Sequence, residues 1–286
     1  MTFIFDGKSF AKEKELELQE KIRELKKKKI TPKLVSIVVG DIDGAMKYQE
    51  MKKKAGERIG IDVEVKQFDE KVALSELVTF IKTLNEDTSV HGIMIQLPLP
   101  KSFAKEDRAI LIHSIALGKD VDGMNEKSDF IAPVVMAVLN AFHQALNSKS
   151  EIRSTKEAQN INVSVVGAEG FEGKKMAKAF QAWGYPVIKL DRKLQNVVFI
   201  NHEISHSDVV VSCTGSPASI VGKVIKKGAI LIDVGAPKGD FEFESVSKKA
   251  SFITPVPGGI GPVTIISLME NVVNAMEKIG SQRSEV

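Results

Sequence analysis

The chain has 286 residues, of which 43% are hydrophobic and 27% are charged, proportions typical of a folded globular protein and not of a disordered one. Its 40 basic and 37 acidic residues are mostly intermixed and leave a formal net charge of +3, which argues against a nucleic-acid partner. The length is sufficient for one large domain or two ordinary ones.

The first part of the chain alternates between strand-like and helical patterns. Short apolar or β-branched runs predict strands over residues 34–40, 61–68 and 91–100. Apolar residues at helical spacing predict helices over residues 11–29 and 73–85, and another in the later part of 39–60, after a strand end and a polar turn. Strands and helices in this order predict a parallel sheet with right-handed crossovers.

One of these helices places a lysine beside its apolar face. At about 100° per residue, a single stripe contains Tyr48, Met51, Lys52, Ala55 and Ile59. The opposite face carries charged residues that need only water. Two interpretations of Lys52 are open: its ammonium extends past the apolar face into water, or it points into a functional site.

The second part of the chain, from about residue 160, has a Rossmann-like pattern. Strands are predicted over residues 161–167, 185–191, 207–215, 229–235 and 251–257, and helices over 172–184 and 263–280. A mostly helical segment, residues 128–151, connects the two parts. Open parallel sheets of this kind bind ligands beyond the carboxyl ends of their strands.

Small-residue turns follow three of these strands. Gly167, Gly170 and Gly173 are spaced G-x-x-G-x-x-G, which differs from the dinucleotide fingerprint G-x-G-x-x-G, and a tight turn without a ligand would also explain them. The turns CTGSPASI (213–220) and DVGAPKG (233–239) stand at equivalent places after later strands. Together they leave room for a flat, extended ligand along one edge of the sheet.

Residues after the second Rossmann strand bear on the kind of dinucleotide. Asp191 stands near the place where an acid binds the ribose 2′-hydroxyl of NAD. Arg192, Lys193 and Lys174 are near it in the pattern and would equally suit the 2′-phosphate of NADP. These residues leave both cofactors open.

Three further stretches are hard to explain as structure alone. QLPLP places the polar Gln96 at the end of an apolar strand, with Pro98 as part of a rigid wall. KDVDG places Asp120 and Asp122 in a turn that we expect to be exposed, where an Asx turn is the plain alternative. PVPGGIGP (255–262) precedes a long helix and suits a rigid backbone lying flat against a ligand.

The sequence predicts no metal site and no membrane segment. The single Cys213 excludes an intrachain disulfide and a multi-cysteine metal site. His202 and His206 are four residues apart, but the neighbouring serines predict a loop around them. No apolar run approaches about 18 residues, and the first residues lack the order of a signal peptide. A cytoplasmic location is therefore expected.

Taken together, these motifs resemble one family, the bifunctional methylenetetrahydrofolate dehydrogenase/cyclohydrolases. The resemblance covers nearly the whole chain and runs in order through FDGKSFAKE, VGD…YxxxK, GIMIQLPLP, KDVDG, KKGAILIDVG and TPVPGGIGPVT. It implies two α/β domains: a folate-binding catalytic domain with a parallel sheet, and a Rossmann-like NAD(P)-binding domain. The catalytic domain is expected at residues 1–127 with the helix at 264–286 packed back on it, the NAD(P)-binding domain at 128–263, and the active site in the cleft between them.

The resemblance also assigns roles on the folate side. Lys52 matches the catalytic lysine, Gln96 the glutamine that works with it, and Tyr48 the tyrosine that lines the folate site. Asp122, the second acid of KDVDG, matches the aspartate that holds the pterin ring. The expected substrate-binding residues also include Pro98, beside Gln96. The resemblance adds Gly258, Gly259 and Pro262, in a loop with Ile260 and Gly261 that folate and nicotinamide share.

For the cofactor, the resemblance implies NADP, with NAD possible. The expected cofactor-binding residues are Gly167, Ala168, Glu169, Gly170, Gly173, Lys174, Asp191, Arg192, Thr214, Gly215, Val234, Gly235, Gly259 and Ile260. The family's G-R-S turn, whose arginine helps to hold the 2′-phosphate, is Gly167-Ala168-Glu169 here, and a glutamate would repel a phosphate. Ala45 and the segment 130–133 also depart from the family, which has serine and P-C-T-P at these places.

The implied activity is the oxidation of 5,10-methylenetetrahydrofolate to 5,10-methenyltetrahydrofolate with NADP, followed by hydrolysis to 10-formyltetrahydrofolate. These are steps of one-carbon metabolism and purine biosynthesis. The implied partners are tetrahydrofolate derivatives and a second copy of the chain in a homodimer, with no nucleic acid, membrane or metal. The altered turn leaves a second hypothesis open: a folate- or nucleotide-binding relative with impaired or absent dehydrogenase activity, which retains cyclohydrolase activity or a regulatory role.

Overall fold

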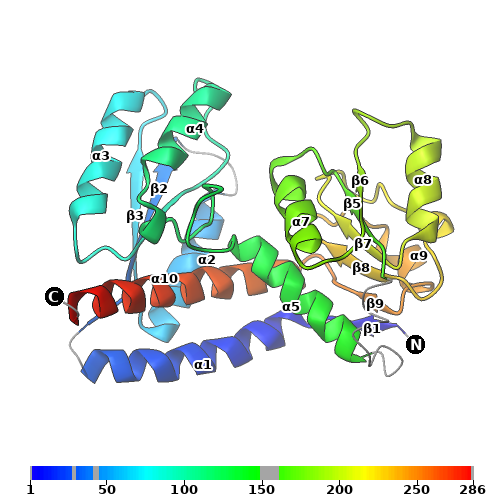
Figure 1. Cartoon of the computed structure of the whole chain (residues 1–286), viewed down its shortest axis with the longest axis horizontal. Coiled ribbons are helices and arrows are strands. Elements are labelled where there is room, and N and C mark those ends of the chain that lie inside the picture. The colour runs from blue at the N-terminus through cyan, green and yellow to red at the C-terminus, as the bar shows by residue number, and fades with distance from the viewer. Residues whose placement is uncertain (1, 28–29, 41–44, 149–160, 285–286) are drawn as a thin grey trace. The chain divides into compact units, whose positions relative to one another are not determined.

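The computed structural model describes residues 2–27, 30–40, 45–148 and 161–284 and divides into two compact units. The first unit comprises Met1–Ala11 and Val134–Thr264, and the second comprises Lys12–Pro133 and Ile265–Val286. Each unit contains one parallel sheet, which confirms the α/β fold class (Figure 1). The domain boundaries given above stay a prediction.

The sheet of the second unit has three strands in the order β3-β2-β4. They are β2 (Lys33–Val39), β3 (Asp62–Phe68) and β4 (Gly92–Ile95). β2 is the central strand and is buried along almost its whole length. Such burial fits the continuous apolar run of its sequence, because both faces of a parallel sheet are usually covered.

The two faces of this sheet have different neighbours. Val35, Ile37 and Ile93 share a core with residues of α3 (Leu74–Glu86) and α4 (Lys105–Ser114). Side chains alternate between faces along a strand, so Ser36 and Met94 point to the opposite side. That second face is where Lys52 of α2 (Ala45–Ile59) reaches Met94.

The sheet of the first unit has six parallel strands in the order β1-β9-β8-β7-β5-β6. The strands are β1 (Phe3–Ile4), β5 (Val163–Val166), β6 (Val187–Leu190), β7 (Val209–Ser212), β8 (Ile230–Asp233) and β9 (Phe252–Ile253). α7 (Phe171–Ala182) and α8 (Val197–His206) flank the sheet on opposite sides, and α9 (Phe243–Ser247) is a short additional helix (Figure 1). The order from β6 to β9 is Rossmann-like, because the chain reverses direction across the sheet next to β5.

Three longer helices contribute residues to both units. They are α1 (Gly7–Lys27), α5 (Pro133–Ser148) and α10 (Ile260–Ser284). Short 3-10 turns occupy Leu117–Lys119 and Gly222–Val224. In the described part of the chain, no helix is both long and apolar enough to cross a membrane.

Several elements differ from the sequence-based expectations. His202 and His206 lie on α8, so the prediction of a loop there was wrong. β4 ends at Ile95, because Pro98 and Pro100 lack the N–H that a ladder requires. The elements β1, α4 and α9 were not predicted, and the ends of the predicted segments at 28–29 and 149–151 lie outside the described residues.

Within the second unit, Asn271 of α10 holds two backbone segments. Its Nδ2 donates to the carbonyl oxygens of Val121, at 2.8 Å, and Ile131, at 2.9 Å. Asn271 is 3% exposed, so neither bond is easily replaced by water. Val121 directly precedes Asp122, so this amide fixes the backbone that carries a predicted substrate-binding residue.

We expect Asn271→Ala to lower the free energy of unfolding by about 1–3 kcal/mol, because it leaves two buried carbonyl groups without donors. Urea unfolding followed by circular dichroism measures the change. Glu277→Ala, an exposed position on the same helix, is the matched control and should change stability by less than about 0.5 kcal/mol. Equal stability of the two variants would contradict the role assigned to Asn271.

Candidate functional site

The topology of the second unit brings two chemically active elements together. β2 lies between β3 and β4, so the chain leaves β2 in two directions and creates a switch point between β2 and β4. α2 follows β2, and Gln96 directly follows β4. The backbone N–H of Gln96 still donates to the Ile37 carbonyl of β2, at 2.8 Å, which holds Gln96 at this edge of the sheet.

Lys52 is buried at this switch point. It is 6% exposed, and its Nζ donates a 2.8 Å hydrogen bond to Oε1 of Gln96. Nζ also lies 3.5 Å from Sδ of Met94. Of the two interpretations of Lys52, its extension into water is therefore wrong.

Burial changes the acid–base chemistry of Lys52. Removal of the ammonium from water lowers its pKa from 10.5 to about 8, against the opposing effect of the Asp122 carboxylate, which raises it. With this pKa, about a tenth of the molecules carry a neutral Lys52 amine at pH 7, so the residue can accept as well as donate a proton.

Gln49 completes a three-residue cluster with Lys52 and Gln96. It is 1% exposed, and its Nε2 donates to Oε1 of Gln96 at 2.7 Å. The Gln96 oxygen thus accepts from both neighbours, while the Gln96 Nε2 donates to the carbonyl of Leu97 at 2.6 Å. These bonds fix which way the Gln96 amide points. Within the described part of the chain, Oε1 of Gln49 is buried without a hydrogen-bond partner, so it can receive a bond from a bound molecule.

The apolar stripe predicted on α2 is shifted by part of a turn. Ala55 and Ile59 are buried with Lys52, but Tyr48 and Met51 are each 40% exposed. Gln49 takes a buried place on the face that the stripe assigned to Tyr48. Sequence reasoning missed it because a glutamine in a polar helix gives no signal of burial by itself.

The two acids of KDVDG have separate roles. Asp120 is fully buried, and its carboxylate accepts from the backbone N–H groups of Met124, at 3.1 Å, and Asn125, at 2.8 Å. The expectation of an exposed turn was therefore wrong for Asp120, which braces the loop. Asp122 is half-buried, and its carboxylate acts electrostatically on Lys52. Pro98 is exposed.

In the first unit, the small-residue turns lie at one edge of the sheet. β6, β5, β7 and β8 are parallel neighbours, so their carboxyl ends meet at that edge. The cofactor-binding candidates that follow these ends are Gly167, Ala168 and Glu169 after β5, Asp191 and Arg192 after β6, Thr214 and Gly215 after β7, and Val234 and Gly235 after β8. β5 and β7 border the switch point, where the ligand of a Rossmann sheet binds.

The turn after β5 has to be made of small residues. Gly167 has φ +81°, and its N–H donates to the Leu190 carbonyl at 2.8 Å. A side chain at Gly173 would collide with the Gly167 carbonyl. Gly170 is the N-cap of α7 and directs the amino end of that helix toward the edge of the sheet. Ala168, which is buried, stands where the family has an arginine, so this position carries no positive charge for a phosphate.

Acidic and basic groups are mixed beside this turn. Asp191 accepts from the backbone N–H groups of Glu169, at 3.2 Å, and Lys193, at 2.9 Å. The Glu169 carboxylate lies 3.3 Å from Nζ of Lys174, so this lysine offsets the acid that replaces the family's serine. Arg192 and Lys193 are exposed immediately after Asp191.

Glu172, in the first turn of α7, was not predicted as a site residue. Burial raises the pKa of its carboxyl, although Lys175 opposes the shift. Its Oε2 is buried and has no hydrogen-bond partner in the described part of the chain. The raised pKa favours the neutral carboxyl, which can donate a hydrogen bond, more than in a solvent-exposed glutamate.

Two buried aspartates hold the backbone of the turns that follow β7 and β8. Asp240 accepts from the N–H of Thr214 at 2.7 Å, and Asp233 accepts from the N–H of Gly235 at 2.8 Å. Gly215 has φ +61° and open space on its side-chain side. The backbones of the turns after β7 and β8 are therefore held in place by these carboxylates, and the side-chain side of Gly215 is open.

The PVPGGIGP loop lies in the first unit, at the start of α10. Gly258 has φ +109°, and the Gly259 N–H donates to the Pro255 carbonyl at 2.8 Å. A side chain at Gly7 would collide with the Gly259 carbonyl, which explains the glycine in FDGKS. Ile260 is buried, and Gly261 and Pro262 are half-buried in the first turn of α10.

Comparison with known proteins gives family matches to both parts of the chain. A model described as the catalytic domain of tetrahydrofolate dehydrogenase/cyclohydrolase matches residues 5–122, and one described as its NAD(P)-binding domain matches residues 149–280. The bifunctional protein FolD of Nautilia profundicola is 34% identical over 300 residues, covering 98% of this chain and 99% of the relative. That of Bacillus subtilis is 33% identical over 294 residues, covering 96% and 98%.

Solved structures agree with these matches. A bifunctional methylenetetrahydrofolate dehydrogenase/cyclohydrolase from Campylobacter jejuni has a TM-score of 0.86 at 32% identity, covering 97% of this chain and 99% of that one. A Trypanosoma brucei methylenetetrahydrofolate dehydrogenase-cyclohydrolase complexed with NADP and an inhibitor has a TM-score of 0.87 at 27% identity, covering 97% and 98%.

The electrostatic link between Asp122 and Lys52 can be measured directly. We expect Asp122→Asn to lower the pKa of Lys52 below about 8, because removal of the negative charge disfavours the ammonium. NMR titration of lysines labelled at Cε measures the pKa, and the signal missing from Lys52→Met assigns Lys52. Glu126→Gln, at an exposed acid of the same loop, should leave it unchanged. An unchanged or raised value in Asp122→Asn would contradict the link.

Proposed function

Because the chain belongs to the tetrahydrofolate dehydrogenase/cyclohydrolase family, we propose that it oxidises 5,10-methylenetetrahydrofolate and hydrolyses the product to 10-formyltetrahydrofolate. The protein is an NAD(P)-dependent enzyme of one-carbon metabolism. The contact that supports the assignment of catalytic groups is the 2.8 Å hydrogen bond between Lys52 and Gln96. The alternative without dehydrogenase activity finds no support in these comparisons.

Lys52 serves as the proton carrier of the hydrolysis. A water molecule adds to the bridge carbon of the methenyl cation, and the neutral Lys52 amine accepts a proton from it. The C–N5 bond then breaks as the ammonium returns its proton to N5, and the hydroxyl of the adduct loses its proton to water as the C=O bond forms, so that a formyl group stays on N10 and one proton is released overall. A pKa of about 8 suits both transfers, because each form of Lys52 is accessible near neutral pH.

Gln96 and Gln49 hold this amine in position. The Gln96 oxygen accepts from Lys52 in either protonation state, and Gln49 prevents the Gln96 amide from turning over. The Oε1 of Gln49, which has no partner among the described residues, is available to accept a hydrogen bond from the attacking water. Positioning of this kind contributes to rate without a change of charge.

Three further folate-side assignments lie in the second unit with Lys52. Asp122 binds the pterin ring by accepting hydrogen bonds from its N–H groups, and Tyr48 and Pro98 offer exposed surface to the substrate. Gly258, Gly259 and Pro262, which belong to the first unit, are proposed as substrate contacts on the grounds of the family match.

The residues at the edge of the six-stranded sheet suit a dinucleotide. The amino end of α7 and the uncovered Gly215 suit the pyrophosphate, and Asp191 suits a ribose hydroxyl. Arg192 and Lys193 supply the cations that a 2′-phosphate needs in place of the family's arginine. We therefore propose NADP as the cofactor, with NAD possible. A cofactor held by these residues would supply the hydride acceptor for oxidation of the methylene bridge. A homodimer and a cytoplasmic location complete the proposal.

We expect Lys52→Met to reduce cyclohydrolase activity by at least about 10²-fold, the contribution typical of a positioned acid–base group. The loss of methenyltetrahydrofolate absorbance measures this activity. The NADP-dependent reaction should fall less, because hydride transfer needs positioning more than an acid. Lys53→Met, at the exposed neighbouring lysine, is the control. Unchanged hydrolysis in Lys52→Met would exclude Lys52 as the proton carrier.

Lys52→Met should also change stability with a defined sign. Since burial lowers the folded-state pKa to about 8 from 10.5, the unfolded chain binds more protons between these values, and wild-type stability rises with pH across that window. The variant lacks this rise and is more stable at pH 7, by at most about 3 kcal/mol. Urea unfolding at pH 7 and pH 10 measures both effects, and a less stable variant at pH 7 would contradict the account.

The proposed 2′-phosphate site predicts a difference between two cofactors. Replacement of Arg192 and Lys193 by alanine should raise KM for NADP about tenfold or more while changing KM for NAD little, since each charge-assisted hydrogen bond contributes about 1.5–3 kcal/mol. Steady-state kinetics with each cofactor measure the effect. Lys189→Ala, an exposed cation on β6, is the control. Equal changes for both cofactors would place the 2′-phosphate elsewhere.

A further inference from the structure

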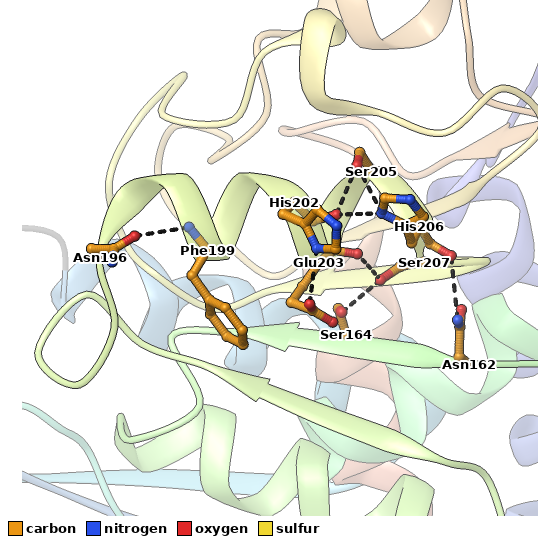
Figure 2. Close-up of polar contacts among 9 residues, drawn as sticks. All are labelled: Asn162, Ser164, Asn196, Phe199, His202, Glu203, Ser205, His206 and Ser207. Carbon is orange, nitrogen blue, oxygen red and sulfur yellow. Dashed lines mark hydrogen bonds and ion pairs between the residues drawn. The ribbon is translucent and has the colours of Figure 1, made fainter.

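Two histidines on α8 form an exposed pair that the proposed activity does not use. His202 and His206 are separated by one helical turn, and the centroids of their rings are 4.4 Å apart at an interplanar angle of 35° (Figure 2). Both side chains are exposed. With Glu203 between them, they have the spacing H-E-x-x-H, in which two imidazoles on one helix face can bind one metal ion.

The hydrogen bonds of His206 determine which ring nitrogen carries its proton. The Ser205 hydroxyl donates its single proton to the His202 carbonyl at 2.7 Å. Towards Nδ1 of His206, 3.1 Å away, the hydroxyl can then only accept, and the His202 carbonyl, 2.8 Å from the same Nδ1, can also only accept. Nδ1 of His206 is therefore protonated, and in the neutral ring the lone pair belongs to Nε2.

His202 reaches the same state through a carboxylate. Its Nδ1 lies 3.1 Å from Oε1 of Glu203, which favours a proton on Nδ1 and leaves the lone pair on Nε2 (Figure 2). Metal-binding histidines commonly donate their other N–H to a carboxylate or a backbone carbonyl in this way. Here His202 has a carboxylate as its partner and His206 has a backbone carbonyl.

The end of α8 is held firmly enough to present a preformed pair. The Ser207 hydroxyl donates to the Glu203 carbonyl at 2.8 Å, and the hydroxyl groups of Ser207 and Ser164 are 2.6 Å apart. Ser164 lies in β5 and both serines are fully buried, so this chain of bonds ties the last turn of α8 to the sheet. A cation at this place is also favoured by the carboxyl end of the helix dipole.

We propose that His202 and His206 form a binding site for a divalent late transition-metal ion such as Zn²⁺, through their Nε2 atoms. Imidazole nitrogen suits Zn²⁺, Ni²⁺ and Cu²⁺ and does not suit Mg²⁺ or Ca²⁺. In the described part of the chain no group of three or more histidine, cysteine or acidic side chains could hold a metal, so water completes the coordination. The Glu203 carboxylate supports a histidine, so the site binds metal without hydrolysing a substrate.

Calorimetric titration of the untagged, full-length protein with ZnCl₂ tests this proposal. The expected result is one Zn²⁺ per chain, lost in His202→Ala and in His206→Ala and kept in His113→Ala, an exposed histidine on α4 without a partner at this spacing. Glu203→Ala should weaken binding by about tenfold or more, the usual cost of losing such support. MgCl₂ should give no saturable heat.

Electron paramagnetic resonance of the wild-type protein with one equivalent of Cu²⁺ gives a second readout that needs no variant. The expected spectrum shows coupling to two imidazole nitrogens. The absence of saturable Zn²⁺ binding, or unchanged binding in His202→Ala or His206→Ala with a wild-type circular dichroism spectrum, would overturn the proposal. So would a copper spectrum without coupling to two imidazole nitrogens.

Discussion

The burial of the Lys52 ammonium against the Gln96 oxygen is the constraint on which the site of the second unit depends. A lysine is rarely buried without compensation, because its charge loses the hydration of water. Compensation here requires an amide oxygen at a fixed point. That point is fixed because β4 pairs with β2, because Gln96 still bonds to Ile37 beyond the end of the strand, and because Gln49 holds the amide from the other side. The hydrogen bond to Gln96 compensates the burial of the Lys52 ammonium, and the lowered pKa lets Lys52 give up and take back a proton.

The two units use one topological rule with different chemistry. In each, the candidate site follows the carboxyl ends of parallel strands at the place where the chain reverses direction across the sheet. The second unit places long polar side chains there. The first presents backbone and glycine instead, braced by the buried Asp233 and Asp240. This difference suits a reaction centre that moves protons in one unit and a large, flat ligand held by many weak contacts in the other.

The sequence predicted the alternation of elements and the contact between Lys52 and Gln96, because long apolar patterns and a distinctive order of motifs carry that information. Its failures have local physical reasons. Gln49 is buried by its partner Gln96, which no spacing rule reveals. Asp120 is buried because two backbone N–H groups replace water around it. The helix at His202 was missed because serines favour loops in isolation, whereas Ser207 here bonds to the Glu203 carbonyl and stabilises the helix end.

The pairing of β1 with β9 has a consequence for the order in which the protein can fold during its synthesis. Phe3 pairs with Phe252, so β1 gains its strand neighbour only after β9, far along the chain, has been synthesised. The other unit is in the same position, because Asn271 holds backbone that was made about 150 residues earlier, at Val121. Long-range closure of this kind slows folding and leaves unpaired strand edges exposed meanwhile. The second unit lacks Asn271 until α10 has been synthesised, so a chain interrupted before that helix would leave the carbonyl groups of Val121 and Ile131 without this donor.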